Sequence, residues 1–330
     1  MASHIERRKF LATLLGGAAA AWPLAASAQI SGKTYRIGFL GVFSYAEYRR
    51  QVDALLMGLR QLGYEEGKNI VIHYRWAEGR YDRLPELVAE LVNLNVDVLV
   101  THSTPGAEAA KQATSTIPIV VAAVVDPVDT GLVASLARPG GNLTGLTFFV
   151  FELYAKRVEL IREAIPTLMR AAVLINPANP AQFMGVPVMQ RTASALGVEL
   201  VLLEIKARDD IAPAVATATR RAQALVAIEE PLTISNAKQI ADLALQNKLP
   251  MIGFKPQAEA GALIEYGADL ADLYSRAATF VDKILKGTSP ADLPVERAAK
   301  FELIVNLKTA RALGLEVPTS ILLRANEVIE

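Results

Sequence analysis

Residues 84–125 read LPELVAELVNLNVDVLVTHSTPGAEAAKQATSTIPIVVAAVV and contain two helix–strand pairs in succession. Apolar residues recur at helical spacing over Leu84–Leu94, and a helical segment spans 105–114. Val96–Val100 and Ile117–Val125 are short runs of mainly β-branched, apolar residues. Strands of this kind, separated by helices, are typical of a parallel sheet that is covered on both faces.

The same alternation of strand and helix extends from residue 35 to residue 314. A turn-rich stretch, LARPGGNLTG at 136–145, interrupts it, and the pattern restarts near 145–150 with a helix over about 153–165. Two series of this length predict an α/β protein with two doubly wound, parallel-sheet lobes. The other expected strands are Tyr35–Leu40, Ile70–Trp76, Ala171–Ile175, Val198–Ile205, Ala224–Ile228, Met251–Phe254, Ala262–Tyr266 and Phe301–Val305.

Composition excludes several classes of function. The 330 residues carry 34 basic and 34 acidic side chains, so nothing in the net charge favours nucleic acid or an anionic membrane as a partner. Cysteine is absent, which excludes disulfides, thiolate catalysis and cysteine-ligated metals. Three histidines are too few for a histidine-rich metal site. The stretch Pro139–Gly141 lacks phosphate-loop spacing, and no G-x-S-x-G occurs. We therefore expect no metal, no cofactor and no catalytic residue.

The first 28 residues have the pattern of an export signal. The basic residues Arg7, Arg8 and Lys9 precede a short apolar stretch, which ends at the A-x-A sequence Ala26-Ser27-Ala28. We expect cleavage after Ala28 and a periplasmic mature protein with a net charge of −2. The string RRKFL resembles a twin-arginine signal, and an ordinary Sec signal is the alternative.

Ligands of open parallel sheets bind beyond the carboxyl ends of the strands, so the residues that follow each strand are the candidates. Ser44 and Tyr45 follow the first predicted strand, and His102, Ser103 and Thr104 follow the third. The two hydroxyl residues stand where a helix begins, which suits a carboxylate or another anion. The alternative is that a hydroxyl group only caps its own helix.

Two acids and one amide follow other predicted strands: Asp126, Glu230 and Asn176. An Asp at such a position either caps a turn or holds an ammonium group, and Asp126 and Glu230 could face one cleft from opposite lobes. Two carboxylates also suit a glycosidase, but no companion motif accompanies them. The aromatic residues Phe148, Phe254 and Tyr266 lie near strand ends as well, as walls for an apolar ligand or as ordinary core.

Five longer motifs carry a resemblance to a known family. The chain resembles the ABC-transporter substrate-binding proteins of the tryptophan/tyrosine-binding type over nearly all of the mature sequence. The matching segments are GYEEGKNIVIHYRWAEGRYDRLPELVAELV at 63–92, THSTPGAEAAKQATSTIPIVVAAVVDPVDTGLVASLARPGGNLTGLT at 101–147, INPANP at 175–180, LALQNKLPMI at 243–252 and EYGADLADLYSRAA at 265–278.

The resemblance implies the type I periplasmic-binding fold, with three hinge crossings near Thr144–Thr147, near Tyr266–Ala268 and before Phe301. The first lobe would then comprise 29–146 plus 268–300, and the second 147–267 plus 301–330. It also implies that Ser103 and Thr104 hold a ligand carboxylate and that Asp126 meets an ammonium group.

The chain departs from the family pattern at three positions. Many relatives have Asp where this chain has Glu230, and they often have Tyr where it has Phe254 and Ser where it has Glu265. The longer Glu230 side chain would move its carboxylate inward, which favours a smaller or different solute over a standard α-amino acid.

The expected function is therefore capture of a small organic solute, an amino acid or an aromatic or carboxylate compound, for the membrane permease of an ABC importer. A monomer is the expected state. The alternatives are a periplasmic sensor that presents its closed form to a membrane receptor, and an enzyme on the same fold.

Overall fold

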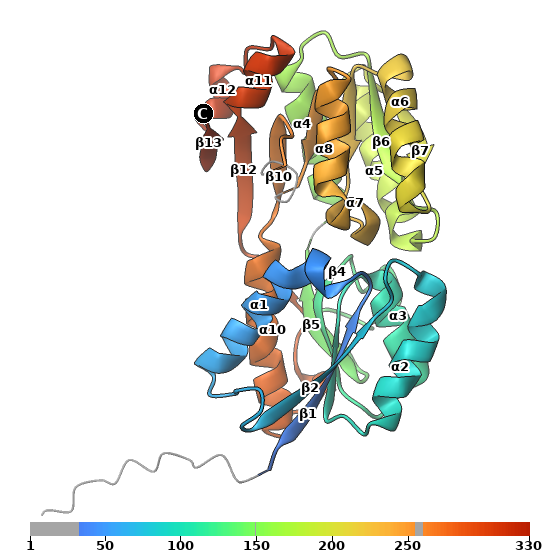
Figure 1. The fold of residues 1–330 in the computed structure, drawn as a ribbon, viewed down its shortest axis with the longest axis vertical. Coiled ribbons are helices and arrows are strands. Elements are labelled where there is room, and N and C mark those ends of the chain that lie inside the picture. Colours follow the sequence, from blue (N-terminus) through green and yellow to red (C-terminus); the bar gives the residue numbers. More distant parts are fainter. Residues whose placement is uncertain (1–32, 149, 255–259) are drawn as a thin grey trace, which may run out of the picture. The chain divides into compact units, whose positions relative to one another are not determined.

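The structure of the protein is a computed structural model, which describes residues 33–148, 150–254 and 260–330. It contains two β-sheets. We call each sheet with its helices a lobe (Figure 1). Both lobes belong to one compact unit, Thr34–Glu330. The predicted α/β architecture of two parallel-sheet lobes is confirmed. The export signal predicted over residues 1–28 lies outside the described residues, and the predicted lobe boundaries stay predictions.

The first lobe contains a six-stranded parallel sheet with the order β11-β5-β4-β3-β1-β2. Helices α2 and α3 pack together on one face, and α1 and α10 on the other. The strands are β1 (Tyr35–Gly41), β2 (Ile70–Trp76), β3 (Val98–Thr101), β4 (Ile119–Val124), β5 (Leu143–Thr147) and β11 (Glu296–Arg297). The helices are α1 (Tyr45–Gln61), α2 (Leu84–Asn93), α3 (Thr104–Ala113) and α10 (Leu270–Leu285).

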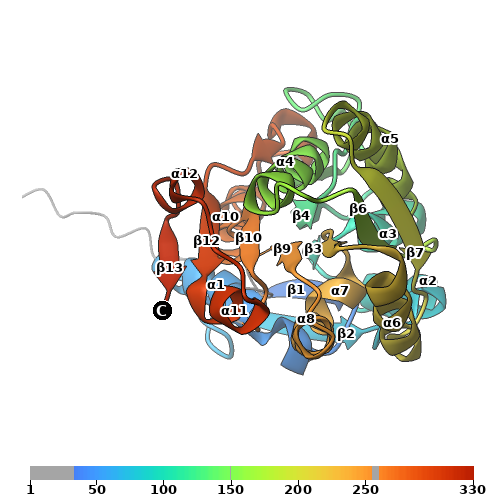
Figure 2. The ribbon, with the colours of Figure 1, turned by 90° about the horizontal axis from the view of Figure 1, so that it is seen from above.

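The second lobe contains a seven-stranded sheet with the order β13-β12-β10-β9-β8-β6-β7. Helices α4 and α5 pack together, as do α6 and α8 (Figure 2). The strands are β6 (Arg170–Ile175), β7 (Glu199–Glu204), β8 (Ala224–Ala227), β9 (Met251–Gly253), β10 (Ile264–Ala268), β12 (Phe301–Asn306) and β13 (Glu327–Ile329). The helices are α4 (Val150–Ala164), α5 (Pro180–Ala195), α6 (Ile211–Arg221), α7 (Pro231–Ser235), α8 (Ala237–Gln246), α11 (Leu307–Leu313) and α12 (Thr319–Leu322).

Two features of the sheets differ from the sequence expectation. First, β10 and β12 pair antiparallel, because β10 leaves the second lobe toward α10 and β12 returns from the first lobe. Second, the stretch 136–145, predicted as turns, contributes its last residues to the fully buried strand β5. Pairing with β4 and burial outweigh the poor strand propensity of its glycine there.

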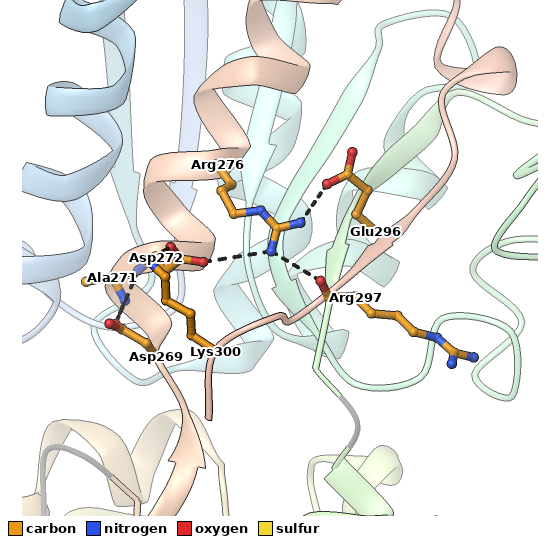
Figure 3. Close-up of polar contacts among 7 residues, drawn as sticks. All are labelled: Asp269, Ala271, Asp272, Arg276, Glu296, Arg297 and Lys300. Carbon is orange, nitrogen blue, oxygen red and sulfur yellow. Dashed lines mark hydrogen bonds and ion pairs between the residues drawn. The ribbon is translucent and has the colours of Figure 1, made fainter. Parts of the chain in front are cut away.

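Two of the segments that connect the lobes lie side by side where α10 begins. Asp269 follows β10 and caps α10, and its N–H donates to the carbonyl of Lys300, 3.2 Å away, just before β12. The Lys300 ammonium donates to Asp272 at 2.6 Å. Arg276 donates to the carbonyl of Arg297 and to Glu296 (Figure 3). These contacts fasten both connecting segments to the first lobe.

Candidate functional site

Both sheets have the neighbour order of a doubly wound fold, with a topological switch point between β1 and β3 in one lobe and between β6 and β8 in the other. Residues that follow these four strands meet between the lobes. The first lobe contributes Ser44 after β1 and His102, Ser103 and Thr104 after β3, and the second contributes Asn176 after β6 and Glu229 and Glu230 after β8.

An inner cavity lies between these strand ends, with about 420 Å³ of empty space that is partly open to solvent. Its accessible lining is mainly apolar, as is typical of sites for small organic molecules. The lining residues are Tyr48, His102, Ser103, Thr104, Ala123, Val125, Phe148, Asn179, Glu229, Glu230, Pro231, Ile234, Leu270 and Tyr274. Five of the predicted ligand residues are among them: His102, Ser103, Thr104, Phe148 and Glu230.

The first-lobe wall holds buried hydroxyl groups that have no hydrogen-bond partner within the described part of the chain. They belong to Ser103 and Thr104, where α3 begins, and to Tyr48 and Tyr274. Ser103 has a positive φ of 60° and its side chain does not cap α3. Leaving a buried hydroxyl unpaired costs about 1–3 kcal/mol, and a polar group that accepted from or donated to these hydroxyls would recover that free energy. The alternative that the Ser103 hydroxyl only caps its own helix is therefore wrong.

His102 is held neutral within this wall. Its Nε2 accepts a hydrogen bond from the N–H of Val42 at 3.2 Å, so in the neutral ring the proton resides on Nδ1. Burial lowers the pKa of His102 to about 3. The ring packs against Tyr48 with centroids 4.4 Å apart. His102 is thus suited to donate a hydrogen bond rather than to act as a base near neutral pH.

The second-lobe wall contains a buried ion pair that the sequence analysis did not identify. The Arg157 guanidinium on α4 is fully buried and donates to both carboxylate oxygens of Glu229, at 2.6 Å for Nη1 to Oε2. Its Nε donates to the carbonyl of Tyr266 at 2.8 Å, and the guanidinium lies 5.6 Å from the centre of the Phe254 ring. Arg157 sits among apolar residues at helical spacing, and no local motif distinguishes it from a solvated helix arginine.

Glu230 is buried and makes contacts with both lobes. Its Oε1 accepts from the hydroxyl of Tyr81, the first residue of a 3₁₀ turn (Tyr81–Arg83) in the first lobe, and from Asn176 Nδ2 at 2.9 Å. Its Oε2 accepts from the N–H of Leu232 at 2.6 Å and caps α7. Burial raises the pKa of the Glu230 carboxyl, although the hydrogen bonds from Tyr81 and Asn176 act in the opposite direction.

An outer cavity of about 1240 Å³, open to solvent, lies next to Tyr81 and Asn176. It has both acidic and basic residues in its walls, and the predicted residues Ser44 and Asn176 line it. The lining residues are Phe43, Ser44, Glu47, Glu78, Gly79, Arg80, Tyr81, Asp82, Asn176, Ala178, Lys206, Ala207, Arg208, Leu232 and Asn236.

Four predicted residues are not among the described residues that line either cavity: Tyr45, Asp126, Phe254 and Tyr266. The Asp126 carboxylate accepts from the N–H groups of Val128 (3.1 Å) and Asp129 (3.2 Å), so it caps the turn after β4. Tyr45 is exposed and its ring lies edge-on to Trp76. A role for Asp126 toward an ammonium group stays a prediction.

Within the described residues, no cluster of acidic and histidine side chains is arranged to hold a metal ion. The same residues include no helix with the length and apolarity that crossing a bilayer requires.

Comparison with known proteins establishes the family. The model of the ABC transporter substrate binding protein family matches residues 38–329, so the chain belongs to that family of solute-binding proteins. It is 28% identical over 287 residues to the tyrosine-binding protein of Clostridioides difficile (strain R20291), covering 87% of this chain and 83% of that protein.

Two solved structures are similar to the whole two-lobe unit. One is the ABC domain of a Streptococcus pneumonia protein in complex with L-Trp (26% identity, TM-score 0.83, 90% of this chain and 100% of that chain). The other is the ligand-free, open structure of a Clostridium difficile substrate-binding protein with adhesive properties (26% identity, TM-score 0.64, 90% of this chain and 99% of that chain).

Proposed function

We propose that this protein captures an aromatic α-amino acid in the inner cavity and delivers it to the permease of an ABC importer. The observation that carries the proposal is a set of buried hydroxyl groups around a mainly apolar cavity, which have no partner among the residues that the structure describes. Hydroxyl donors where α3 begins suit a carboxylate, which also gains from the positive end of the helix dipole. Apolar residues such as Val125, Phe148 and Leu270 suit an aromatic side chain.

The ammonium group of such a ligand would lie at the second-lobe wall. Glu229 and Glu230 are the two carboxylates that line the inner cavity, and both face it from that lobe. Arg157 already neutralises Glu229, which leaves Glu230 as the acid that would meet the ammonium group. In this proposal Glu230 takes the role that the resemblance implied for Asp126. A standard α-amino acid then fits, contrary to the expectation from the length of Glu230, because Asn176 and the N–H of Leu232 hold its carboxylate in the second-lobe wall.

The comparisons support this ligand class and a closed arrangement of the lobes. Tyrosine and L-Trp are the ligands named for two relatives of this chain. The two solved relatives have equal identity to it, yet the TM-score is 0.83 with the L-Trp complex and 0.64 with the ligand-free, open structure. Since a two-lobe binding protein closes about its ligand by hinge motion, this difference favours the ligand-bound lobe arrangement.

We also propose that the chain is exported by its first 28 residues, is cleaved after Ala28 and acts as a periplasmic monomer. The family works with membrane permeases outside the cytoplasm, and the residue pattern of the first 28 positions is that of an export signal.

A thermal-shift screen of the purified protein against the twenty amino acids and simple aromatic acids tests the ligand class. A ligand that binds only the folded state raises the melting temperature by mass action. We expect shifts with L-tryptophan or L-tyrosine and smaller ones with indole-3-acetate, which lacks the ammonium group. Equal shifts with aromatic acids and amino acids would contradict the role of Glu230, and a shift confined to non-aromatic compounds would overturn the proposal.

A further inference from the structure

Three hydrogen-bonded residues, Tyr81, Asn176 and Glu230, lie at the walls of the two cavities, and we call them the partition. Glu230 lines the inner cavity, whereas Tyr81 and Asn176 line the outer one. The three side chains converge on one atom, because the Tyr81 hydroxyl and the Asn176 amide both donate to Glu230 Oε1. The partition therefore joins the two lobes through residues that line the inner cavity on one side and the outer cavity on the other.

The hydrogen-bonding roles within the partition are fixed by the chemistry of its members. Glu230 is almost completely buried, and its other oxygen is bound to the N–H of Leu232, so the carboxylate cannot turn without losing a bond. Burial and the nearby Glu230 carboxylate raise the pKa of Tyr81 well above its usual value, so its hydroxyl stays a donor. An Asn amide nitrogen can only donate.

We propose that Tyr81 is a specificity-determining residue. It admits an aromatic amino acid whose own α-amino group is free and excludes peptides in which a further residue is attached to that amino group. The inference rests on the proposed function, because it takes the ligand ammonium group to lie beside Glu230. With the partition in place, an extra residue on the amino group would collide with Tyr81 and break its bond to Glu230. Without the Tyr81 ring, that residue would enter the outer cavity, whose walls carry Glu78, Lys206 and Arg208.

Binding of matched ligands tests the proposal. Isothermal titration calorimetry would compare L-tryptophan with Gly-Trp, extended at the amino end, and Trp-Gly, extended at the carboxyl end. In Tyr81→Ala the ratio of the Gly-Trp Kd to the L-tryptophan Kd should fall at least tenfold, whereas Trp-Gly should stay excluded. Tyr81→Phe keeps the ring but loses the bond to Glu230, so L-tryptophan should bind roughly tenfold more weakly. An unchanged Kd ratio in Tyr81→Ala would overturn the proposal.

Tyr64→Phe is the matched control. The Tyr64 hydroxyl also donates to a carboxylate, Asp282 Oδ1 at 2.9 Å, but both residues belong to the first lobe and line neither cavity. This variant should keep the ligand ratios of the wild type. If it changed them as Tyr81→Ala does, the effect would come from general destabilisation and the proposal would fail.

A second measurement needs no ligand, because the chain has no cysteine. Ala123 lines the inner cavity, so Ala123→Cys provides one thiol behind the partition. A charged thiol reagent should label it at least tenfold faster in the Tyr81→Ala background than in the wild-type or Tyr64→Phe background. Equal rates would show that the partition does not control access. If the wild type bound neither L-tryptophan nor L-tyrosine, the proposed ligand class would fail, while these rates would still decide whether Tyr81 controls access to the inner cavity.

Discussion

At the scale of single residues, two sets of buried polar groups lie at the inner cavity: hydroxyls without a partner among the described residues, and a paired arginine and glutamate. Among the described residues, the hydroxyls of Ser103 and Thr104 have no hydrogen-bond partner, and the positive φ of Ser103 adds backbone strain, so both features are unfavourable for stability. The buried Arg157 and Glu229 are tolerated because each charge neutralises the other. The first set is therefore expected to act on ligand affinity and the second on folding.

Replacing Thr104 by Val tests the hydroxyl wall. The change keeps the shape of the side chain and removes the donor, so L-tryptophan binding should weaken by about 1–3 kcal/mol if the hydroxyl contacts the carboxylate. Calorimetry would measure the change, with Thr217→Val on α6 as the control because its hydroxyl bonds only within that helix. Unaltered affinity in Thr104→Val would show that this hydroxyl does not contact the ligand.

Removing one member of the buried ion pair should be more damaging than removing both. Arg157→Met leaves the Glu229 carboxylate buried without its partner and should cost about 3–5 kcal/mol of unfolding free energy. Adding Glu229→Gln to Arg157→Met removes the uncompensated charge and should restore part of that loss. Urea denaturation would compare the three proteins. Our account of the pair would be wrong if the double variant were less stable than the single one.

His102 should make stability depend on pH. Its pKa in the native protein is about 3, whereas an unfolded histidine has a pKa near 6.5. Between these values the unfolded chain binds a proton that the native state does not, so the unfolding free energy falls as the pH is lowered from about 6.5 toward 3. The slope from this residue is at most about 1.4 kcal/mol per pH unit.

Urea denaturation at pH 7, 6 and 5 would measure that slope. His102→Asn retains an acceptor for the N–H of Val42 and should lose the contribution, whereas His73→Asn on β2 should retain it. Identical slopes in His102→Asn and the wild type would contradict the assigned state of His102.

At the scale of elements, sequence patterns predicted the regular helices and strands because their burial is regular. Leu84–Leu94 was predicted as a helix from the spacing of its apolar residues, and Leu84–Asn93 forms helix α2. Val96–Val100 was predicted as a strand from its apolar run, and the wholly buried strand β3 covers Val98–Thr101. Strand β5 was not predicted because pairing with β4, a non-local contact, places Thr144 and Gly145 in a strand, and no local sequence pattern indicates that pairing. The partner of Glu230 was missed for the same reason, since Tyr81 is 149 residues away in sequence.

Gly145 shows how tightly β5 depends on its neighbour. Its φ is 134°, and a Cβ there would lie 2.1 Å from the carbonyl oxygen of Val121 on β4. Neither backbone can move without breaking the β4–β5 ladder, so Gly145→Ala should cost about 3 kcal/mol or more. Gly141→Ala is the control, because that Cβ would meet no atom within 4 Å and should change stability by less than about 0.5 kcal/mol. Urea denaturation of both variants would check the contrast, and equal stabilities would contradict it.

At the scale of the whole molecule, the contacts around Arg276 determine which parts move together. Asp272, Glu296, Arg297 and Lys300 join both adjacent connecting segments to α10, which packs against α1 and β4 of the first lobe. In the lobe rotation that we propose, α10 and the two connecting segments therefore move with the first lobe. The bond between Tyr81 and Glu230 spans the two lobes, and the proposed ligand would add contacts to both walls of the inner cavity.

This geometry predicts that ligand makes the protein more compact. Contacts that exist only in the closed form shift the population toward it by their own free energy, so saturating L-tryptophan should lower the radius of gyration measured by small-angle X-ray scattering. Thr104→Val should reach the same final radius at a higher ligand concentration, because the variant loses affinity but keeps the hinge. If calorimetry recorded binding while the radius of gyration stayed constant, the ligand would occupy lobes that are already closed. The bond between Tyr81 and Glu230 would then be sufficient to hold them together.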